Sequence, residues 1–407
     1  MNILHIHTHT NLGGAAKVAK NLHLKLPQYG ITSKLYAGRG IADISNNIEV
    51  LGIYQWQFVA NALIYRLSSI EAPLNVDRWF KVLPALLDWA DVIHIHNVHG
   101  YYMPTLVLEK ILEKPVVWTL HDEWIMTGRC TFSGNCQRYK QGCYFCPHLD
   151  IYPSTLVDRA RHDFITRHRL VTTSKAILVS PSNILRQKLI DAGFCAERIQ
   201  VIPNPTEFQE SYNLKERQII KEELKLPHNK IIILFVANVI SYDRKGFDIL
   251  EAALHKLTNP EKFLLIVIGK YNEKIQKKLN NLPIQFRLMG TIDSRTEIKR
   301  YYASSDVLVV PSREESFGLV TTEALSQGCQ VICSDIPVFR EVTDGKAIFF
   351  PVGDAQELAL KLNDFYNQKE NYQVSDLFIK KIREKFSFET VVNAYIKQYH
   401  AAKANNF

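Results

Sequence analysis

Residues 307–323 read VLVVPSREESFGLVTTE, a short apolar run followed by a polar loop and the start of a helical pattern. A wholly apolar run such as 307–310 is typical of a strand buried in a parallel sheet. Glu315 is expected in the loop, and the helix is expected to start near Gly318, with Glu323 more than one turn into it. This order predicts an open α/β sheet, in which ligands bind at the carboxyl ends of the strands.

The same alternation of strands and helices runs through the rest of the chain. Such alternation predicts parallel sheets covered on both faces by helices. In the first half, strands are predicted at residues 3–7, 92–96, 116–120, 177–180 and 200–202, with a helix at 15–26. In the second half, strands are predicted at 231–237, 263–269, 285–289, 307–310 and 331–334, with helices at 246–257 and 318–327.

The length of 407 residues predicts two domains, since one hydrophobic core rarely serves so long a chain. Pro203-Asn204-Pro205 and the polar stretch 206–217 interrupt regular structure, so the boundary is expected there. The prediction is a Rossmann-like domain at 1–203 and a second at 204–385, with sheets facing across a cleft. A final amphipathic helix near 388–399, within the segment 386–407, is expected to fold back on the first domain.

Composition places the chain among ordinary globular proteins, with 46% hydrophobic and 22% charged residues. The sequence shows no apolar run of membrane-spanning length and no leader pattern, so cytoplasmic residence and reduced thiols are expected. A net charge of +8 suits anionic phosphates or the inner face of a membrane, or simply a solvated basic surface. No nucleic-acid partner is expected. A basic cluster that also contains Phe164 and Leu170 predicts contact with lipid headgroups or a lipid-linked acceptor; its cations are Arg159, Arg161, Arg167, Arg169 and Lys175.

Two features suit a phosphate-bearing sugar ligand. Gly13 and Gly14 join the first strand to a helix, where small residues and free N–H groups favour a diphosphate. A tight turn with good strand–helix packing is the alternative. Glu315 and Glu323 have a spacing that lets one carboxylate meet sugar hydroxyls and the other meet a ribose. The alternative for this pair is an acidic loop followed by a surface helix glutamate.

The acidic pair with Phe317-Gly318 between its members resembles the E-x7-E element of glycosyltransferase family 4, whose members are retaining enzymes of the GT-B fold. The resemblance extends over nearly the whole chain. Its further motifs are the Gly13-Gly14 loop, Leu120-His121-Asp122, Val201-Ile202-Pro203-Asn204 and Arg244-Lys245-Gly246.

By this resemblance, the chain is expected to move a hexose from a UDP- or GDP-sugar to a saccharide or lipid-linked acceptor, with retention, in bacterial polysaccharide synthesis. His121, Lys245 and Glu315 are implied as the catalytic residues. His121 is expected to contact the donor sugar and Glu323 the ribose. The remaining donor-binding positions implied are Gly13, Gly14, Arg244, Lys245, Glu315, Phe317, Gly318 and Leu319.

Two positions depart from the family pattern. Ile240 stands where members commonly carry an arginine five residues before the lysine, so Arg244 is expected to supply the second cation. Pro205 stands where a glycine usually follows the asparagine, which is expected to stiffen a hinge about Pro203-Asn204. No protein nucleophile and no catalytic metal are expected, because cations and helix N-termini can stabilise a diphosphate leaving group.

Four cysteines lie between the His121 strand and the next helix, at Cys130, Cys136, Cys143 and Cys146. Four thiols within so short a segment of a reduced protein predict a structural zinc site, with His148 as a substitute ligand. Free thiols or disulfides are the alternative. The resemblance includes a subgroup of exopolysaccharide enzymes with a similar cysteine loop. The other cysteines, at Cys195, Cys329 and Cys333, are expected to be packing residues.

Histidines gather at two strand ends, His5, His7 and His9 at one and His94, His96 and His99 at the other. Alternate positions on a strand face the same side, so His5 and His7 can present a metal pair. A metal-dependent hydrolase is therefore one alternative function. A non-catalytic protein that binds nucleotide sugars is another.

Overall fold

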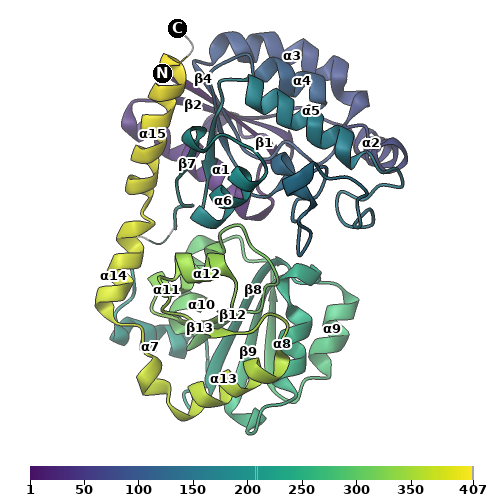
Figure 1. Ribbon diagram of the computed structural model, residues 1–407. Helices are drawn as coiled ribbons and strands as arrows, with labels where there is room; N and C mark the ends of the chain where they lie inside the picture. The colour runs from purple at the N-terminus through teal and green to yellow at the C-terminus, as the bar shows by residue number, and fades with distance from the viewer. Residues whose placement is uncertain (207, 209, 406–407) are drawn as a thin grey trace. The chain divides into compact units, whose positions relative to one another are not determined.

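The computed structural model describes residues 1–206, 208 and 210–405. It divides into two compact units, Met1–Pro203 with Val391–Phe407, and Asn204–Thr390. We call these the first and the second unit. Each is an α/β unit built on one parallel sheet, which confirms the predicted Rossmann-like architecture (Figure 1). Asn406 and Phe407, at the end of the segment expected to fold back, lie outside the described residues.

The first unit holds a seven-stranded parallel sheet in the order β3-β2-β1-β4-β5-β6-β7. The order reverses between β1 and β4, where the topology leaves a crevice for ligands at the carboxyl ends of the strands. The strands are β1 Asn2–His9, β2 Thr32–Arg39, β3 Ile48–Val50, β4 Val92–Ile95, β5 Val116–Thr119, β6 Ile177–Ser180 and β7 Ile199–Val201.

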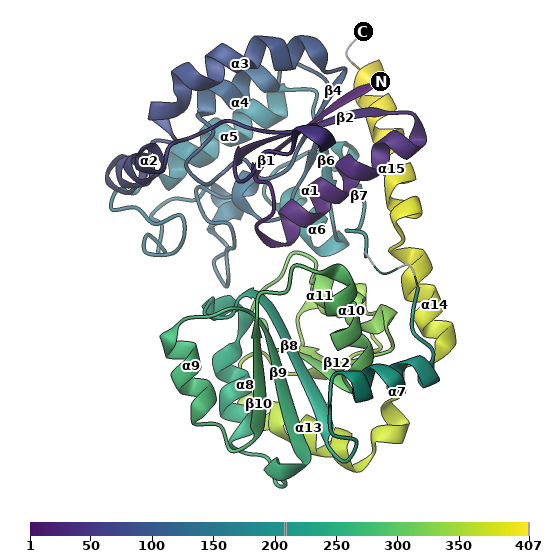
Figure 2. The same cartoon turned by 180° about the vertical axis from the view of Figure 1, so that it is seen from behind.

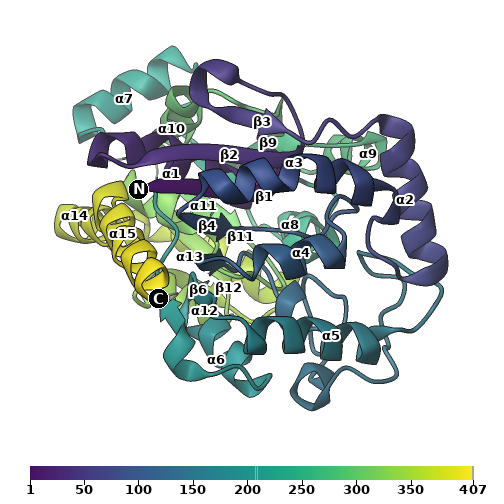
Figure 3. The same ribbon diagram turned by 90° about the horizontal axis from the view of Figure 1, so that it is seen from above.

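Side chains of the first sheet alternate between two different environments. Leu4 and Ile6 of β1 join an apolar core with α3 and α4 on one face, where α3, α4 and α5 lie in a row (Figure 3). His5 points to the other face and lies near α1 through His23, with 6.0 Å between the ring centroids. The helices are α1 Gly13–Lys25, α2 Gln55–Ser68, α3 Val76–Trp89, α4 Thr105–Ile111, α5 Ala160–Thr173 and α6 Asn183–Asp191.

The C-terminal helix α15, Phe388–Ala404, covers the histidine face of the first sheet with two buried tyrosines. The Tyr399 hydroxyl lies 2.8 Å from Nδ1 of His94, and the Tyr395 hydroxyl lies 2.9 Å from Oγ1 of Thr119. From residue 391 onward this helix is thus an integral part of the first unit.

The second unit holds a six-stranded parallel sheet in the order β10-β9-β8-β11-β12-β13, with its reversal between β8 and β11 (Figure 2). The strands are β8 Ile231–Val239, β9 Phe263–Lys270, β10 Gln285–Gly290, β11 Val307–Val310, β12 Gln330–Ser334 and β13 Ile348–Phe350. The helices are α7 Leu214–Glu223, α8 Phe247–Leu254, α9 Glu273–Asn280, α10 Arg295–Ser304, α11 Leu319–Ser326, α12 Pro337–Val342, α13 Ala355–Asn367 and α14 Asp376–Lys385.

Three strands of the structure were not predicted, β2, β3 and β13. The strands β3 and β13 are three-residue edge strands, too short to show a pattern, and β2 contains Lys34 and Arg39, which interrupt its apolar run. Among the described residues, no helix combines the length and the apolar character needed to cross a membrane.

Candidate active site

The loops after β8 and β11 meet at the strand-order reversal of the second sheet. The loop after β8 contains the 3-10 turn Asp243–Lys245, and Gly246 ends it with a φ of 70°. A Cβ at Gly246 would lie 1.9 Å from the carbonyl oxygen of Pro311, which follows β11. Only glycine therefore allows the two loops to approach so closely.

Arg313 ties the same two loops together. Its backbone N–H donates to the carbonyl of Arg244 at 2.8 Å. Its guanidinium donates to both carboxylate oxygens of Asp248, at 2.9 and 2.6 Å. A bidentate arginine of this kind fixes orientation as well as distance, so the position of the β8 loop relative to the β11 loop is well defined.

A carboxylate and two cations occupy this junction. Lys245 Nζ forms an ion pair with Glu315 Oε1, and Arg244 Nη1 lies 3.5 Å from Glu315 Oε2. The Ser312 hydroxyl also donates to Glu315, at 3.1 Å. The Glu315 side chain is only 8% exposed. Burial by itself would raise the pKa of Glu315, but the nearby Lys245 and Arg244 charges outweigh it and lower that pKa, so the carboxylate is ionised.

The same surroundings favour the charged form of Glu315 but disfavour the charged form of Lys245. Burial lowers the pKa of Lys245 and the Glu315 charge offsets part of that effect. A partly desolvated cation beside a second cation is well suited to a phosphate-bearing ligand.

The second predicted acidic residue, Glu323, lies within α11 and accepts a hydrogen bond from the Tyr302 hydroxyl at 2.8 Å. Gly318, with a φ of 84°, stands immediately before this helix, and a Cβ there would clash with the Phe339 ring at 2.5 Å. The Phe317 side chain, by contrast, is 2% exposed and belongs to the core of the second unit.

The departure at Ile240 is explained by burial. Ile240 is 1% exposed and belongs to the apolar core of the second unit. Arg244, whose direction the sequence left open, points toward Glu315. The second cation at the junction is therefore adjacent to Lys245 in the sequence.

In the first unit, the predicted glycine loop and His121 follow β1 and β5. Gly13, with a φ of 89°, is the first residue of α1, and no side chain caps the N–H groups of that helix. His121 is 8% exposed, and its Nε2 lies 3.0 Å from Nδ1 of His96. Burial lowers the pKa of His121 to about 4, so its imidazole is neutral near pH 7.

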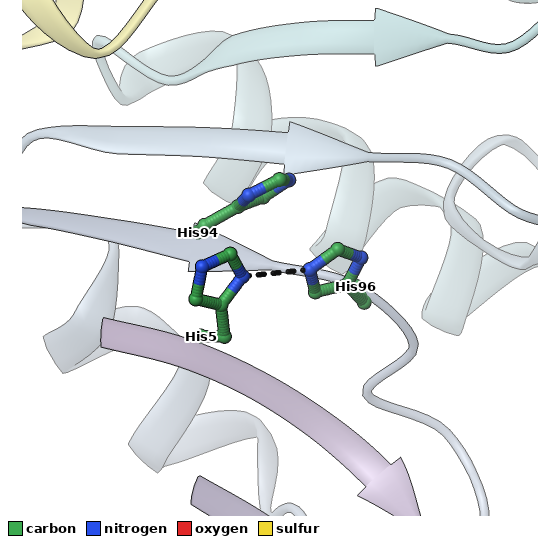
Figure 4. Close-up of side chains that lie close together, drawn as sticks. All are labelled: His5, His94 and His96. Atoms are coloured by element: carbon green, nitrogen blue, oxygen red, sulfur yellow. Dashed lines mark hydrogen bonds between the residues drawn. The ribbon is translucent and has the colours of Figure 1, made fainter. Parts of the chain in front are cut away.

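The strand-end histidines form a buried cluster and not an open metal site. Ligand atoms of His5, His94 and His96 lie within 4.8 Å of one another. Figure 4 shows these three side chains close together. Both ring nitrogens of His94 are occupied, however, by Tyr399 at 2.8 Å and Thr119 at 2.7 Å. A catalytic metal needs a free nitrogen on each ligand and an open coordination position, so the hydrolase alternative is not favoured.

The cysteine segment 120–159 joins β5 to α5, and the structure, which describes all of it, places neither an α-helix nor a strand there. Buried Arg129 donates to the carbonyls of His148 and Ile151, and buried Arg167 donates to that of Thr127. The four predicted thiols, at Cys130, Cys136, Cys143 and Cys146, line one pocket together with His148.

The thiols of the segment lie near one another, but they are not in the compact arrangement that ligands of one metal ion require. The Cys130 and Cys146 thiols interact with each other, and this interaction lowers the pKa of Cys146. Among the described residues, no three of the four sulfurs lie within 4.8 Å of one another. Of the remaining cysteines, Cys329 and Cys333 are buried as predicted, whereas Cys195 is exposed and the prediction for it was wrong.

Only some residues of the predicted basic cluster are exposed. Arg161, Arg169 and Lys175 are exposed. Arg167 is 6% exposed and lies over the Trp124 ring at 4.0 Å, and Leu170 is also buried. The prediction that all five cations face a partner was wrong for Arg167, because its guanidinium donates a hydrogen bond to the loop carbonyl of Thr127.

Sequence reasoning missed several residues that build these sites. No local pattern identifies Tyr302 or Arg313, because each contacts a residue distant in the sequence. Ser312 contacts Glu315 only because the loop folds back on itself. His96 was noted only as one of a group, and its contact with His121 follows from the adjacency of β4 and β5.

Comparisons with known proteins agree with this architecture. The family model described as Glycosyltransferase Family 4 matches residues 12–210, and the one described as Glycosyl transferases group 1 matches residues 216–384. WcaC of Escherichia coli strain K12, a putative colanic acid biosynthesis glycosyl transferase, is 27% identical over 84% of this chain and 85% of its own length.

Two solved structures are similar in fold over nearly the whole chain. Anabaena HepE in complex with UDP and glucose has a TM-score of 0.69 at 16% identity, covering 98% of this chain and 100% of that chain. Sucrose-phosphate synthase from Thermosynechococcus elongatus has a TM-score of 0.73 at 17% identity, covering 99% of each chain.

Two Rossmann-like parallel sheets, together with the two glycosyltransferase family models that match the chain, identify a glycosyltransferase of the GT-B class. The chain belongs to the family-4-like glycosyltransferases, with the Family 4 model on the first unit and the group 1 model on the second.

Proposed function

We propose that this glycosyltransferase moves a hexose from a nucleoside diphosphate sugar to a saccharide or lipid-linked acceptor, with retention of the anomeric configuration. The observation that carries the proposal is the junction of Lys245, Arg244 and Glu315 at the strand-order reversal of the second sheet. Cations and an ionised carboxylate side by side suit a ligand that has both phosphate oxygens and sugar hydroxyls.

In this proposal the ion pair exchanges partners when the donor binds. Lys245 and Arg244 turn to the diphosphate, whose negative charge grows as the glycosidic bond breaks. Glu315 then accepts hydrogen bonds from the sugar hydroxyls, which its lowered pKa favours. Glu323, oriented by Tyr302, accepts from the ribose.

Two further roles come from the first unit. Gly13 and Gly14 offer uncapped N–H groups to the donor phosphates. His121 contacts the donor sugar as a neutral ring. No protein nucleophile is assigned, because attack on the face that the leaving phosphate vacates retains the configuration, and that phosphate accepts the acceptor's proton.

The relatives direct the choice of substrates. WcaC carries the description of a colanic acid biosynthesis enzyme, and HepE was solved with UDP and glucose. We therefore propose a role in bacterial polysaccharide assembly and a UDP-hexose as the first donor to examine.

A labelled-sugar transfer assay tests the function directly. A thermal-shift series of UDP- and GDP-sugars selects the donor, because a ligand of the native state raises its apparent stability. The selected donor, labelled in the sugar, is then offered with saccharide and lipid-linked acceptors. Label in an α-linked product from an α-donor supports a retaining transferase. Inversion contradicts retention, chelator-sensitive hydrolysis indicates the hydrolase, and binding without turnover indicates a non-catalytic protein.

We also propose that the cysteine segment binds one structural zinc ion. The four thiols line one pocket, and a bound metal would bring them closer together. It would also stabilise a segment that contains neither an α-helix nor a strand. Elemental analysis of protein purified without added metal should give one zinc per chain. Cys146→Ser should lower that content, whereas Cys195→Ser, at an exposed cysteine outside the segment, should not. A folded, metal-free protein would overturn this proposal.

We propose that α2 and the neighbouring basic residues contact an anionic lipid surface. Trp56, Val59, Leu63 and Leu67 recur on one face of α2, and each is more than half exposed, between 55% and 64%. The Ser69 hydroxyl, at the end of this helix, donates to Asp163 of α5 at 3.1 Å, and Asp163 lies 3.9 Å from the Arg159 guanidinium, which places a cation in the same region. An apolar stripe beside cations is typical of interfacial helices.

Cosedimentation with vesicles tests this contact. The protein should sediment with phosphatidylglycerol-rich vesicles and much less with phosphatidylcholine vesicles. Leu63→Ser with Leu67→Ser should reduce binding severalfold. Leu377→Ser, which removes an 80% exposed leucine of the second unit, is the matched control and should not. Equal binding to both vesicle types, or no effect of the double variant, would contradict the proposal.

A further inference from the structure

Three imidazoles form a hydrogen-bonded chain that ends at His121. Nδ1 of His5 lies 3.1 Å from Nε2 of His96, and Nδ1 of His96 lies 3.0 Å from Nε2 of His121. Figure 4 shows the first of these links. The His96 ring is nearly parallel to both neighbours, with interplanar angles of 17° to His5 and 16° to His121, as in-plane hydrogen bonds between ring nitrogens require. The chain crosses three adjacent strands, since His5 belongs to β1 and the others follow β4 and β5.

The number of protons on these three hydrogen-bonded imidazoles follows from their pKa values. Burial lowers the pKa of His5 and His96 well below the ordinary value, and that of His121 to about 4, so each ring is neutral at pH 7. A neutral imidazole has one N–H and one acceptor nitrogen. Only two arrangements then satisfy both links. Either all three protons are on Nδ1 and the chain donates toward His121, or all three are on Nε2 and it donates toward His5.

The far end of the chain decides between the two arrangements. Nε2 of His5 is fully buried and has no hydrogen-bond partner. If the chain donated toward His5, this nitrogen would carry a buried N–H without an acceptor, which is rare in proteins and costs about 1–3 kcal/mol. If the chain donates toward His121, the unpartnered atom is only an acceptor lone pair, which is better tolerated.

We propose that His96, itself held by His5, is a positioning residue that fixes His121 as the Nδ1–H tautomer. The ring of His121 is then fixed by its Nε2, and its Nδ1–H is a donor. Among the residues that the structure describes, none forms a hydrogen bond with that Nδ1.

This tautomer restricts what His121 can do. An Nδ1–H group donates to an oxygen, such as a sugar hydroxyl or a phosphate oxygen, and cannot accept the proton of an attacking acceptor at the same atom. The identity of that oxygen rests on the proposed function, but the tautomer does not. His121 is therefore a donor to the substrate and not the general base of the reaction.

Two other buried histidines provide internal references with the opposite tautomer. Nδ1 of His7 accepts the backbone N–H of Asn97 at 3.2 Å, so its proton is on Nε2. Nε2 of His23 lies 2.7 Å from the carbonyl of Asn46, which can only accept, so its proton is also on Nε2.

The experiment is a long-range proton–nitrogen correlation spectrum of the full protein labelled with nitrogen-15 in histidine, at pH 7.5. The pattern of each ring reports which nitrogen carries the proton, and single histidine variants assign the signals. His7 and His23 should show Nε2–H, and His5, His96 and His121 should show Nδ1–H. An Nε2–H pattern for His121 in the unmodified protein would overturn the inference.

Variants of His96 test the positioning role. His96→Leu removes the donor, so His121 should lose the pure Nδ1–H pattern and kcat should fall about tenfold or more. Binding of the nucleoside diphosphate, measured by calorimetry, should stay within about twofold. His96→Asn keeps a donor near the position of Nδ1 and should restore both the tautomer and most of the turnover. His23→Leu removes a buried histidine outside the chain and should change stability without changing the His121 tautomer.

The outcomes separate this inference from the proposed function. The predicted tautomers without any sugar transfer would reject the function and leave the histidine chain standing. Transfer with an unchanged His121 pattern and unchanged kcat in His96→Leu would reject the positioning role and leave the function standing.

Discussion

Lys245 and Glu315 form a partly buried ion pair although they lie 70 positions apart in the sequence. The pair joins the loop after β8 to the loop after β11, the two loops that flank the strand-order reversal. Each charge lowers the cost of burying the other, so a cation and a carboxylate remain available at a place that burial would otherwise neutralise. A ligand with phosphates and hydroxyls can take over both halves of this pair.

Lys245→Met should mainly lower turnover. The lysine is proposed to stabilise charge that develops on the leaving diphosphate, and loss of one such group costs about 10²–10³ in kcat. Steady-state kinetics with the donor identified above measure the effect, while calorimetry follows the smaller change in nucleotide affinity. Lys278→Met removes another lysine of the second unit that pairs with a glutamate, Glu251, and should leave kcat unchanged. Equal kcat in both variants would contradict the role of Lys245.

Glu323→Gln should weaken nucleotide binding by about ten- to a hundredfold, because a hydrogen bond to a charged group is worth about 1.5–3 kcal/mol. Tyr302→Phe removes the hydroxyl that donates to Glu323 at 2.8 Å and should produce a smaller loss of affinity. Calorimetric titration with the nucleoside diphosphate measures both. If Glu323→Gln binds as tightly as the unmodified protein, the ribose contact is wrong.

The architecture was predictable from local patterns, and the contacts of the site were not. Apolar runs such as Val307–Val310 identify parallel strands because both faces of such strands are buried. The direction of Arg244 and the hydrogen bond from Tyr302 depend on where distant segments come to rest, so no local pattern contains them. The burial of Arg167 was likewise not predictable, because a charged residue on an amphipathic helix is expected to be exposed. Its buried partner, the Thr127 carbonyl, lies 40 positions away in the sequence.

Gly246→Ala should destabilise the second unit and impair turnover. The φ of 70° alone costs a non-glycine residue about 1–2 kcal/mol, and the added Cβ would also meet the Pro311 carbonyl at 1.9 Å. Gly345→Ala is the matched control, because Gly345 has the same φ of 70° and no atom within 4 Å of the added Cβ. Thermal unfolding should show a larger loss for Gly246→Ala, and only that variant should move Lys245 and lower kcat. Equal losses of stability would show that the close approach of the loops is unimportant.

The buried histidines should make the first unit acid-sensitive. Burial lowers the native pKa of His5, His7, His94 and His96 well below 6.5, and that of His121 to about 4. Above pH 6.5 these rings are neutral in both the folded and the unfolded chain, so they cause no pH dependence. As the pH falls below 6.5, the unfolded chain binds protons that the folded one excludes. The free energy of unfolding should then drop by up to about 1.4 kcal/mol per pH unit for each histidine.

Tryptophan fluorescence isolates this effect, because the chain has five tryptophans and all of them, Trp56, Trp79, Trp89, Trp118 and Trp124, belong to the first unit. Urea unfolding followed by their emission measures the free energy of unfolding at each pH. We expect this free energy to change little between pH 8 and 7 and to fall steeply between pH 6.5 and 5. His5→Asn removes one of the five imidazoles and keeps a polar group at the site of Nδ1, so the slope below pH 6.5 should decrease by about one proton. A slope that is unchanged in His5→Asn would mean that other groups cause the acid sensitivity, and a stability that stays level down to pH 5 would mean that the cluster accepts protons without unfolding.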